Sequence, residues 1–259
     1  MVLAMGPRTV RLAMLSCLLV VCTGSAPPAV AESEAQQHPS TTPVGPEVTQ
    51  PNHTAPPALR GERPRGPVFA SRPTMKQASD VFTSAGVQPG QPLPQLSLVD
   101  HDGGPFDLRG FQGTRPLVLV TCSLTCNVAR RQAKAVAELR QRHGDQVAVL
   151  LVYTIEAHPN GEACPYTDTG WVPPQNQQDD VLLAQPTTLT DRLALARRYA
   201  RDWSCGVRVV VDPMANDAWW ELGRAPNLCL VVDAEGLVRT RSGWFDAARA
   251  EAALRELHP

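Results

Sequence analysis

Two strongly apolar runs separated by a helical segment constrain the fold of this chain more than any other feature. Residues 117–120 and 146–154 have the composition of buried strands, and residues 127–143 between them follow a helical pattern. Parallel strands need a crossover connection, and a helix of this length supplies it. The pattern predicts a βαβ unit, whose active-site residues would gather at the carboxyl edge of the sheet.

Two cysteines, Cys122 and Cys126, flank the junction between the first strand and the helix. A cysteine at a helix start meets unpaired backbone N–H groups and the positive end of the helix dipole. Such surroundings stabilise a thiolate and lower the pKa of a thiol from its usual value of about 8.5. We therefore expect thiol redox chemistry, with Cys126 as the most reactive thiol and with its pKa depressed.

The first third of the chain lacks the composition of a folded domain. Residues 1–31 resemble a secretory signal peptide, in which Arg8 and Arg11 precede an apolar stretch and residues 29–31 form a small-residue cleavage site. Residues 32–75 are rich in proline and lack apolar periodicity, which predicts a disordered linker. These features predict a secreted or periplasmic protein without stable membrane insertion of the mature chain. The alternative is an uncleaved N-terminal membrane anchor.

Residues 76–259 are long enough for one domain with its own core. A turn signal at residues 101–104 predicts a hairpin ahead of the βαβ unit. The later elements are expected in the order helix, strand, hairpin and helix, at residues 189–203, 207–211, 228–240 and 247–257. This order predicts an α/β thioredoxin-like fold with an N-terminal β-hairpin addition.

Charge and motifs exclude several classes of function. The net charge of −1 gives no basis for nucleic-acid binding. Neither a glycine-rich phosphate loop nor a paired set of zinc ligands is found, so no cofactor and no metal are expected. Cleavage of the signal peptide would leave an odd number of cysteines, Cys122, Cys126, Cys164, Cys205 and Cys229. At least one of them therefore stays unpaired or pairs between molecules.

The folded part resembles the iodothyronine deiodinases of the redoxin superfamily over residues 89–258. The stretch Ser123-Leu124-Thr125-Cys126 resembles the family motif Ser-Cys-Thr-selenocysteine, with Cys126 at the selenium position. Four further segments, at 152–159, 164–166, 189–192 and 212–216, resemble the motifs Tyr-Ile-Glu-Glu-Ala-His-Pro, Ser-Pro-Tyr, Leu-Glu-Asp-Arg and Asp-Thr-Met-Ala-Asn in the same order. The resemblance implies a thiol-dependent oxidoreductase that performs reductive dehalogenation or related redox chemistry.

The resemblance also implies roles for single residues. Cys126 would be the nucleophile, with His158 and Glu156 managing protons. A second thiol and an external thiol reductant would regenerate the enzyme; Cys122 is the first candidate for that thiol and Cys164 is its competitor. Pro226 is expected to lie beside substrate with a cis peptide bond facing the active thiol.

Departures from the family motifs bear on the substrate. Leu124 replaces the family cysteine two residues before the selenium position, and the second loop histidine has no counterpart. The family arginine that contacts the thyronine falls at Trp244, which leaves Arg241 as a displaced candidate for substrate binding. We therefore expect a small-molecule substrate other than thyroxine, such as another halogenated aromatic, or a peroxide or thiol/disulfide substrate.

Two alternative functions share the same cysteines. A thiol peroxidase would need the pattern Pro-x-x-x-Thr-x-x-Cys, in which Ser123 supplies the hydroxyl but Leu119 replaces the proline. A Cu(I) metallochaperone would bind the metal through the thiolates of Cys122 and Cys126. Such proteins usually carry a distal histidine near the last hairpin, and the sequence has none there.

Overall fold

The computed structural model describes residues 66–161 and 164–257. The predicted signal peptide (1–31) and residues 32–65 of the predicted linker lie outside the described residues. Of the helices in the described part of the chain, none combines the length and hydrophobicity needed to cross a bilayer.

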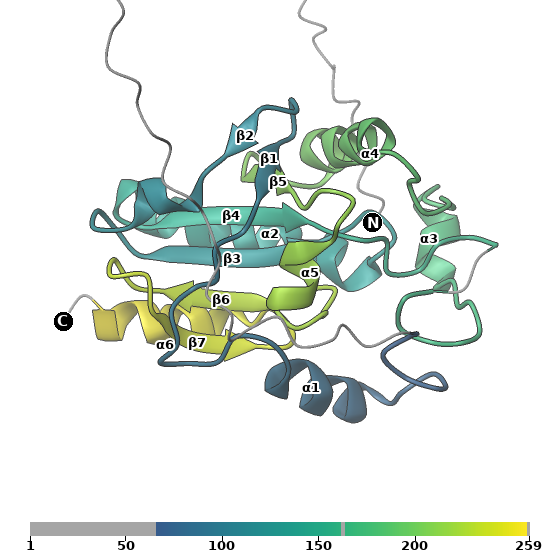
Figure 1. The fold of residues 1–259 in the computed structure, drawn as a ribbon, viewed down its shortest axis with the longest axis horizontal. Helices are drawn as coiled ribbons and strands as arrows, with labels where there is room; N and C mark the ends of the chain where they lie inside the picture. The colour runs from purple at the N-terminus through teal and green to yellow at the C-terminus, as the bar shows by residue number, and fades with distance from the viewer. Residues whose placement is uncertain (1–65, 162–163, 258–259) are drawn as a thin grey trace, which may run out of the picture. The chain divides into compact units, whose positions relative to one another are not determined.

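A mixed seven-stranded sheet forms the centre of the domain, in the order β2-β1-β5-β4-β3-β6-β7 (Figure 1). The strands are β1 (Leu98–Asp100), β2 (Pro105–Phe106), β3 (Leu117–Cys122), β4 (Ala148–Tyr153), β5 (Arg208–Val211), β6 (Cys229–Val232) and β7 (Val238–Ser242). The helices are α1 (Met75–Ser84), α2 (Asn127–His143), α3 (Pro174–Gln178), α4 (Leu189–Asp202), α5 (Asp217–Glu221) and α6 (Ala247–Leu257), with short 3-10 turns η2 (Leu108–Phe111) and η3 (Gly144–Gln146).

The predicted βαβ unit consists of β3, α2 and β4. β3 and β4 run parallel in a register that pairs Leu117 with Ala148 and Cys122 with Tyr153. Every residue of both strands is buried, which explains their continuous apolar sequence. β6 pairs antiparallel with β3, and β7 with β6, while the hairpin β1-β2 joins the far edge through β5. This topology confirms the thioredoxin-like fold with an N-terminal hairpin.

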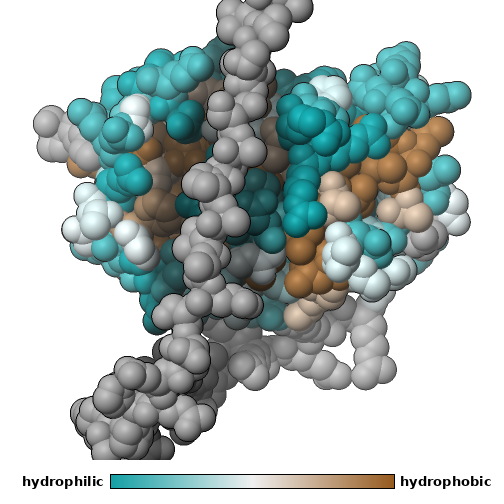
Figure 2. Space-filling view, turned by 90° about the horizontal axis from the view of Figure 1, so that it is seen from above, coloured by the Kyte–Doolittle hydropathy of each residue, from teal (hydrophilic) through white to brown (hydrophobic). Residues whose placement is uncertain are grey.

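Helices pack on both faces of the sheet and along one edge. α2 and α6 contact each other on one face, α5 lies in front of the sheet in Figure 1, and α1 lies beside β7. In the part of the face that Figure 2 leaves visible, hydrophilic side chains alternate with patches of hydrophobic ones. Among the described residues, the large hydrophobic side chains of Met75 and Leu182 are the exposed ones.

The folded domain includes residues before 76, the start that the sequence predicted for it. The backbone N–H of Val68 donates to the Pro165 carbonyl at 3.1 Å, and that of Phe69 donates to the Tyr166 carbonyl at 2.8 Å. α1 then starts with a capping box, in which Thr74 and Gln77 each accept a hydrogen bond from the other's backbone N–H. Residues 66–74, assigned to the linker from composition, are therefore part of the folded domain.

A buried arginine attaches α1 to the sheet. The Arg241 guanidinium on β7 donates to the Phe82 carbonyl at 2.6 Å and to the Thr83 carbonyl at 3.1 Å. Burial lowers the pKa of Arg241 to about 10. The bonded carbonyls lie in the last turn of α1, where helix carbonyls lack intrahelical partners.

We expect Gly223→Ala to weaken the packing of α1 against β7. Gly223 has φ +103°, and a Cβ there would overlap the Ala85 carbonyl and the Arg241 guanidinium. Backbone cannot yield as a flexible side chain can, so the free energy of unfolding should fall by more than about 3 kcal/mol. Gly113→Ala is the control, because Gly113 has φ +72° with open space around it. It should cost only about 1–2 kcal/mol of backbone strain. Urea unfolding measures both variants, and equal losses would contradict the close-packing explanation.

Candidate active site

Cys126 lies where β3 ends and α2 begins. It is the N-cap of α2, and its Sγ accepts a hydrogen bond from the Ala129 N–H at 3.4 Å. Its side chain is buried, with 1% exposed. The predicted position of Cys126 at the start of a helix is confirmed.

Burial, however, outweighs the helix amides in setting the acidity of Cys126. Loss of water raises the pKa of the thiol to about 11, although the backbone N–H groups of Ala129 and Val128 act to lower it. The predicted depression of this pKa is therefore wrong for the closed site. Cys126 is a neutral thiol at pH 7.

The turn that leads into Cys126 is held by the buried carboxylate of Glu156. Its Oε2 accepts hydrogen bonds from the Thr125 backbone N–H at 2.8 Å and from the Thr125 hydroxyl at 2.6 Å, and its Oε1 accepts one from the Tyr153 hydroxyl. Burial raises the pKa of Glu156, while these hydrogen bonds act to lower it. Glu156 therefore acts through Thr125 and is a positioning residue for Cys126.

The loop after β4 is bonded to the same turn. The backbone N–H of His158 donates to the Thr125 hydroxyl oxygen at 3.0 Å, and that of Ala157 donates to the Ser123 hydroxyl oxygen at 3.3 Å. His158 is thus placed beside the turn by its backbone, while its ring is hydrogen-bonded to the Trp171 backbone and packs against the Trp171 ring.

Two polar side chains that the sequence analysis missed bind the turn from the other side. The Arg130 guanidinium donates to the Leu124 carbonyl and to Asn176 Oδ1, and Asn176 Nδ2 donates to the Thr125 carbonyl at 2.9 Å. Arg130 also pairs with Asp179 at 2.8 Å. A sequence signal existed for Arg130, because it is a charged residue at the spacing of the buried stripe of α2. Asn176 lies in α3, a helix of five residues that the sequence did not predict.

Two of the segments that resemble family motifs, 189–192 and 212–216, contact each other and have a structural role. The buried Arg192 guanidinium, at the start of α4, donates to the carbonyls of Asp212 and Pro213 and to Asn216 Oδ1, at 2.7–2.8 Å. Asp212 in turn accepts the N–H groups of Ala218 and Trp219, in α5. The segments 189–192 and 212–216 therefore bind each other, and neither supplies a side chain to the cavity described next.

A cavity of about 280 Å³ lies beside Cys126, and we call it the Cys126 cavity. The cavity is lined by the cysteines Cys126 and Cys164, by the imidazole of His158 and by Pro226. Five aromatic side chains contribute to its wall: Phe69, Phe82, Tyr166, Trp171 and Trp244. Its size is close to the lower end of the range of about 300–1,000 Å³ that is usual for small-molecule sites.

His158 is neutral in this cavity. Only 9% of its surface is exposed, and burial lowers its pKa to about 4. Its ring packs edge-on against Trp171, with 4.4 Å between ring centroids. Its Nδ1 has no hydrogen-bond partner among the described residues. An uncharged imidazole can accept a proton from a thiol and return it, which fits the role the sequence suggested.

Pro226 lines the cavity, but its peptide bond is not as predicted. None of the described peptide bonds is cis, so the expected cis bond before Pro226 is wrong. Thr121 determines the local path, since its hydroxyl donates to the Ala225 carbonyl at 2.9 Å and accepts from the Leu228 N–H at 2.8 Å. This bridge fixes both ends of the segment that contains Pro226.

The other predicted site residues lie outside the cavity wall. Cys122, in the last position of β3, has no exposed surface, and burial raises the pKa of its thiol. Arg241 is occupied by the carbonyls of α1, so its placement gives the predicted substrate contact no support. Glu156 reaches the site only through Thr125.

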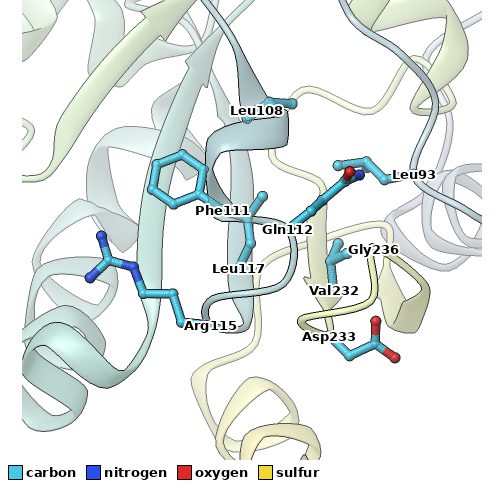
Figure 3. A pocket seen from close by; sticks show the side chains of 9 residues that line it. All are labelled: Leu93, Leu108, Phe111, Gln112, Arg115, Leu117, Val232, Asp233 and Gly236. Atoms are coloured by element: carbon cyan, nitrogen blue, oxygen red, sulfur yellow. The ribbon is translucent and has the colours of Figure 1, made fainter.

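Two other features could attract a ligand, but neither adjoins Cys126. A cavity of about 10 Å³ lies at the opposite end of β3, among residues that include Phe111 and Arg115 (Figure 3), and has room for about one water. Within the described residues, the one cluster of three metal-ligating side chains is Asp100, His101 and Asp102. It contains neither Cys122 nor Cys126.

The sheet is thioredoxin-like, and a cysteine caps the helix that follows β3, so the fold places the chain in the thioredoxin-like class. The model of the iodothyronine deiodinase family matches residues 74–249. That span is more than half of the chain, and the chain therefore belongs to the iodothyronine deiodinase family.

Individual relatives agree with this assignment. Thyroxine 5-deiodinase of Rattus norvegicus is 32% identical over 144 residues, which cover 55% of this chain and 43% of the relative. The Homo sapiens enzyme of the same name is 31% identical over the same length. The chain thus spans less than half the length of these relatives.

Solved structures show only distant likeness. A secreted disulfide oxidoreductase of Mycobacterium tuberculosis has a TM-score of 0.41 at 11% identity, covering 63% of this chain and 96% of that one. The thioredoxin domain of a thiol-disulfide oxidoreductase from Bacteroides vulgatus has a TM-score of 0.44 at 12% identity, covering 67% and 100%.

We expect alkylation of Cys126 to be slow at neutral pH and to rise steeply above pH 9. Only the thiolate reacts, and burial holds the pKa of this thiol near 11. Iodoacetamide labelling followed by peptide mass spectrometry, in a Cys205→Ser background that removes the exposed thiol, gives the pH profile. Circular dichroism at each pH controls for unfolding. An apparent pKa below 8.5 would show that the helix amides dominate after all.

Proposed function

We propose that this protein is an exported, thiol-dependent reductive dehalogenase that acts on small halogenated aromatic molecules, with Cys126 as its nucleophile. The observation that carries the proposal is the Cys126 cavity, where a cysteine and an uncharged histidine are enclosed by aromatic side chains. Family membership supports the type of reaction. Export rests on the signal-like residues 1–31, which lie outside the described residues.

The size and lining of the cavity favour a substrate with one ring. Aromatic walls stack on an aromatic ring, and about 280 Å³ suits one substituted ring better than the two rings of a thyronine. Trp244 lines the cavity where the sequence comparison expected an arginine, so the thyronine contact of the family is replaced by an indole.

The proposed reaction transfers the halogen to sulfur. As Cys126 Sγ attacks the halogen, its proton passes to His158, a bond forms between sulfur and iodine, and the carbon–iodine bond breaks. The ring carbon keeps the electron pair and receives the proton from the His158 imidazolium. The substrate is thereby reduced and Cys126 is oxidised to a sulfenyl iodide. Because the resting thiol and imidazole are both neutral, the proton must pass through His158 to the ring carbon as the carbon–iodine bond breaks, so that neither an imidazolium nor a carbanion accumulates in the buried site.

A second thiol then releases the halide. Its sulfur attacks Cys126 Sγ, iodide leaves, and a disulfide forms that an external dithiol reduces. We assign this step to Cys164, because Cys164 lines the Cys126 cavity and Cys122 does not. Its Sγ lies 3.0 Å from the Thr167 hydroxyl, which can exchange a hydrogen bond with it. The net reaction consumes one aryl halide and one dithiol and yields arene, disulfide, halide and a proton.

Iodide release tests the proposal. The full chain, purified from an exporting host, should release iodide from 2-iodophenol in the presence of a dithiol, and Cys126→Ser should abolish turnover. Cys205→Ser is the matched control, because Cys205 is an exposed free thiol outside the cavity and its loss should leave the rate unchanged. Hydrogen peroxide and a peptide disulfide are assayed alongside. Faster turnover of either one than of any aryl halide would replace dehalogenation by the alternative thiol chemistry.

Peptide mapping identifies the second thiol. After turnover without external dithiol, mass spectrometry of the non-reduced, alkylated digest should find Cys126 linked to Cys164. Cys164→Ser should permit one turnover and then stop, while Cys122→Ser should keep cycling if it folds. A Cys122–Cys126 crosslink in the wild-type protein would reverse the assignment.

A further inference from the structure

The Cys126 cavity has one permanently charged side chain in its wall, Arg72. The other lining residues are aromatic, aliphatic or uncharged, and His158 is neutral because its pKa is lowered to about 4. Arg72 belongs to residues 66–74, the segment that pairs with residues 165–167 through the bridge between Phe69 and Thr167. A single positive charge in an otherwise uncharged cavity is a selectivity feature, since it attracts an anion and discourages a cation.

The guanidinium of Arg72 lies over the ring of Trp171. Its Cζ lies 3.9 Å from the ring centroid of Trp171, and Trp171 in turn packs against His158. A stacked guanidinium keeps its N–H donors in its plane, where they can bind a carboxylate with two parallel hydrogen bonds. The stack therefore orients Arg72 and leaves its donors available.

Arg72 differs in this respect from the buried arginines of the domain. Arg130, Arg192 and Arg241 donate to carbonyl or amide oxygens of the protein. Arg72 is exposed, and among the described residues no carboxylate forms an ion pair with it. Its charge is therefore open to a ligand in the cavity.

We infer that Arg72 forms an anion subsite, so that the substrate is a halogenated aromatic acid whose ring fills the Cys126 cavity and whose carboxylate binds Arg72. This inference rests on the proposed function and narrows its substrate class. Arg72 would be a specificity-determining residue, because it binds the acid group and takes no part in breaking the carbon–halogen bond.

A matched pair of substrates tests the subsite. The full chain is assayed with 4-hydroxy-3-iodobenzoate and with its methyl ester, which has the same ring and halogen without the charge. The wild-type protein should favour the acid in kcat/KM by on the order of 10- to 100-fold, mainly through KM. Arg72→Gln should bring the ratio of acid to ester close to one. Arg72→Lys should retain part of the preference, because the charge stays but the planar stack is lost. Arg109→Gln, which removes an exposed arginine outside the cavity, should leave the ratio unchanged.

A binding measurement tests the Arg72 subsite independently of turnover. Quenching of tryptophan fluorescence gives the Kd of acid and ester for each variant, and Trp171 and Trp244 in the cavity wall are the expected reporters. If neither compound loses iodide but the acid binds tightly and Arg72→Gln weakens it selectively, the dehalogenase proposal fails and the subsite stands. If Arg72→Gln weakens acid and ester equally, or the wild-type protein does not distinguish them, the subsite is refuted.

Discussion

The buried carboxylate of Glu156 is the interaction on which the candidate site depends. It is an acidic group without exposed surface, and it keeps its place by accepting three hydrogen bonds, two from Thr125 and one from Tyr153. A buried carboxylate without such partners would be too costly to retain. Through Thr125 it fixes both the turn that presents Cys126 and the backbone of His158. One carboxylate thereby sets the relative position of the proposed nucleophile and the proposed proton carrier.

The same turn is bound from the other side by Arg130 and Asn176, so its peptide groups are satisfied by side chains instead of water. A fully bonded turn is rigid. Burial of the side chain explains why the thiol of Cys126 is neutral despite its place at a helix start. The closed site therefore keeps the thiol of Cys126 in its less reactive, protonated form.

Sequence reasoning recovered the framework and the position of Cys126, because both follow from local patterns. The apolar runs of β3 and β4 fixed the parallel pair, and the motif around Cys126 matched its position at the N-cap of α2. It missed α1, although Thr74 and Gln77 form a capping box that could have been recognised. The pKa of Cys126, the trans bond before Pro226 and the burial of Arg241 depend on contacts between distant segments, which no local pattern reveals. The motifs at 189–192 and 212–216 looked functional, but they bind each other through Arg192.

The contacts of residues 66–74 have a consequence for what counts as the domain. A fragment that starts at residue 76 would contain every strand of the sheet, along with Cys126 and His158. It would lack Phe69 and Arg72, which form part of the cavity wall. A fragment long enough to form the whole sheet can therefore still be too short to enclose a ligand. Fragments chosen by secondary structure alone would report on a half-open site.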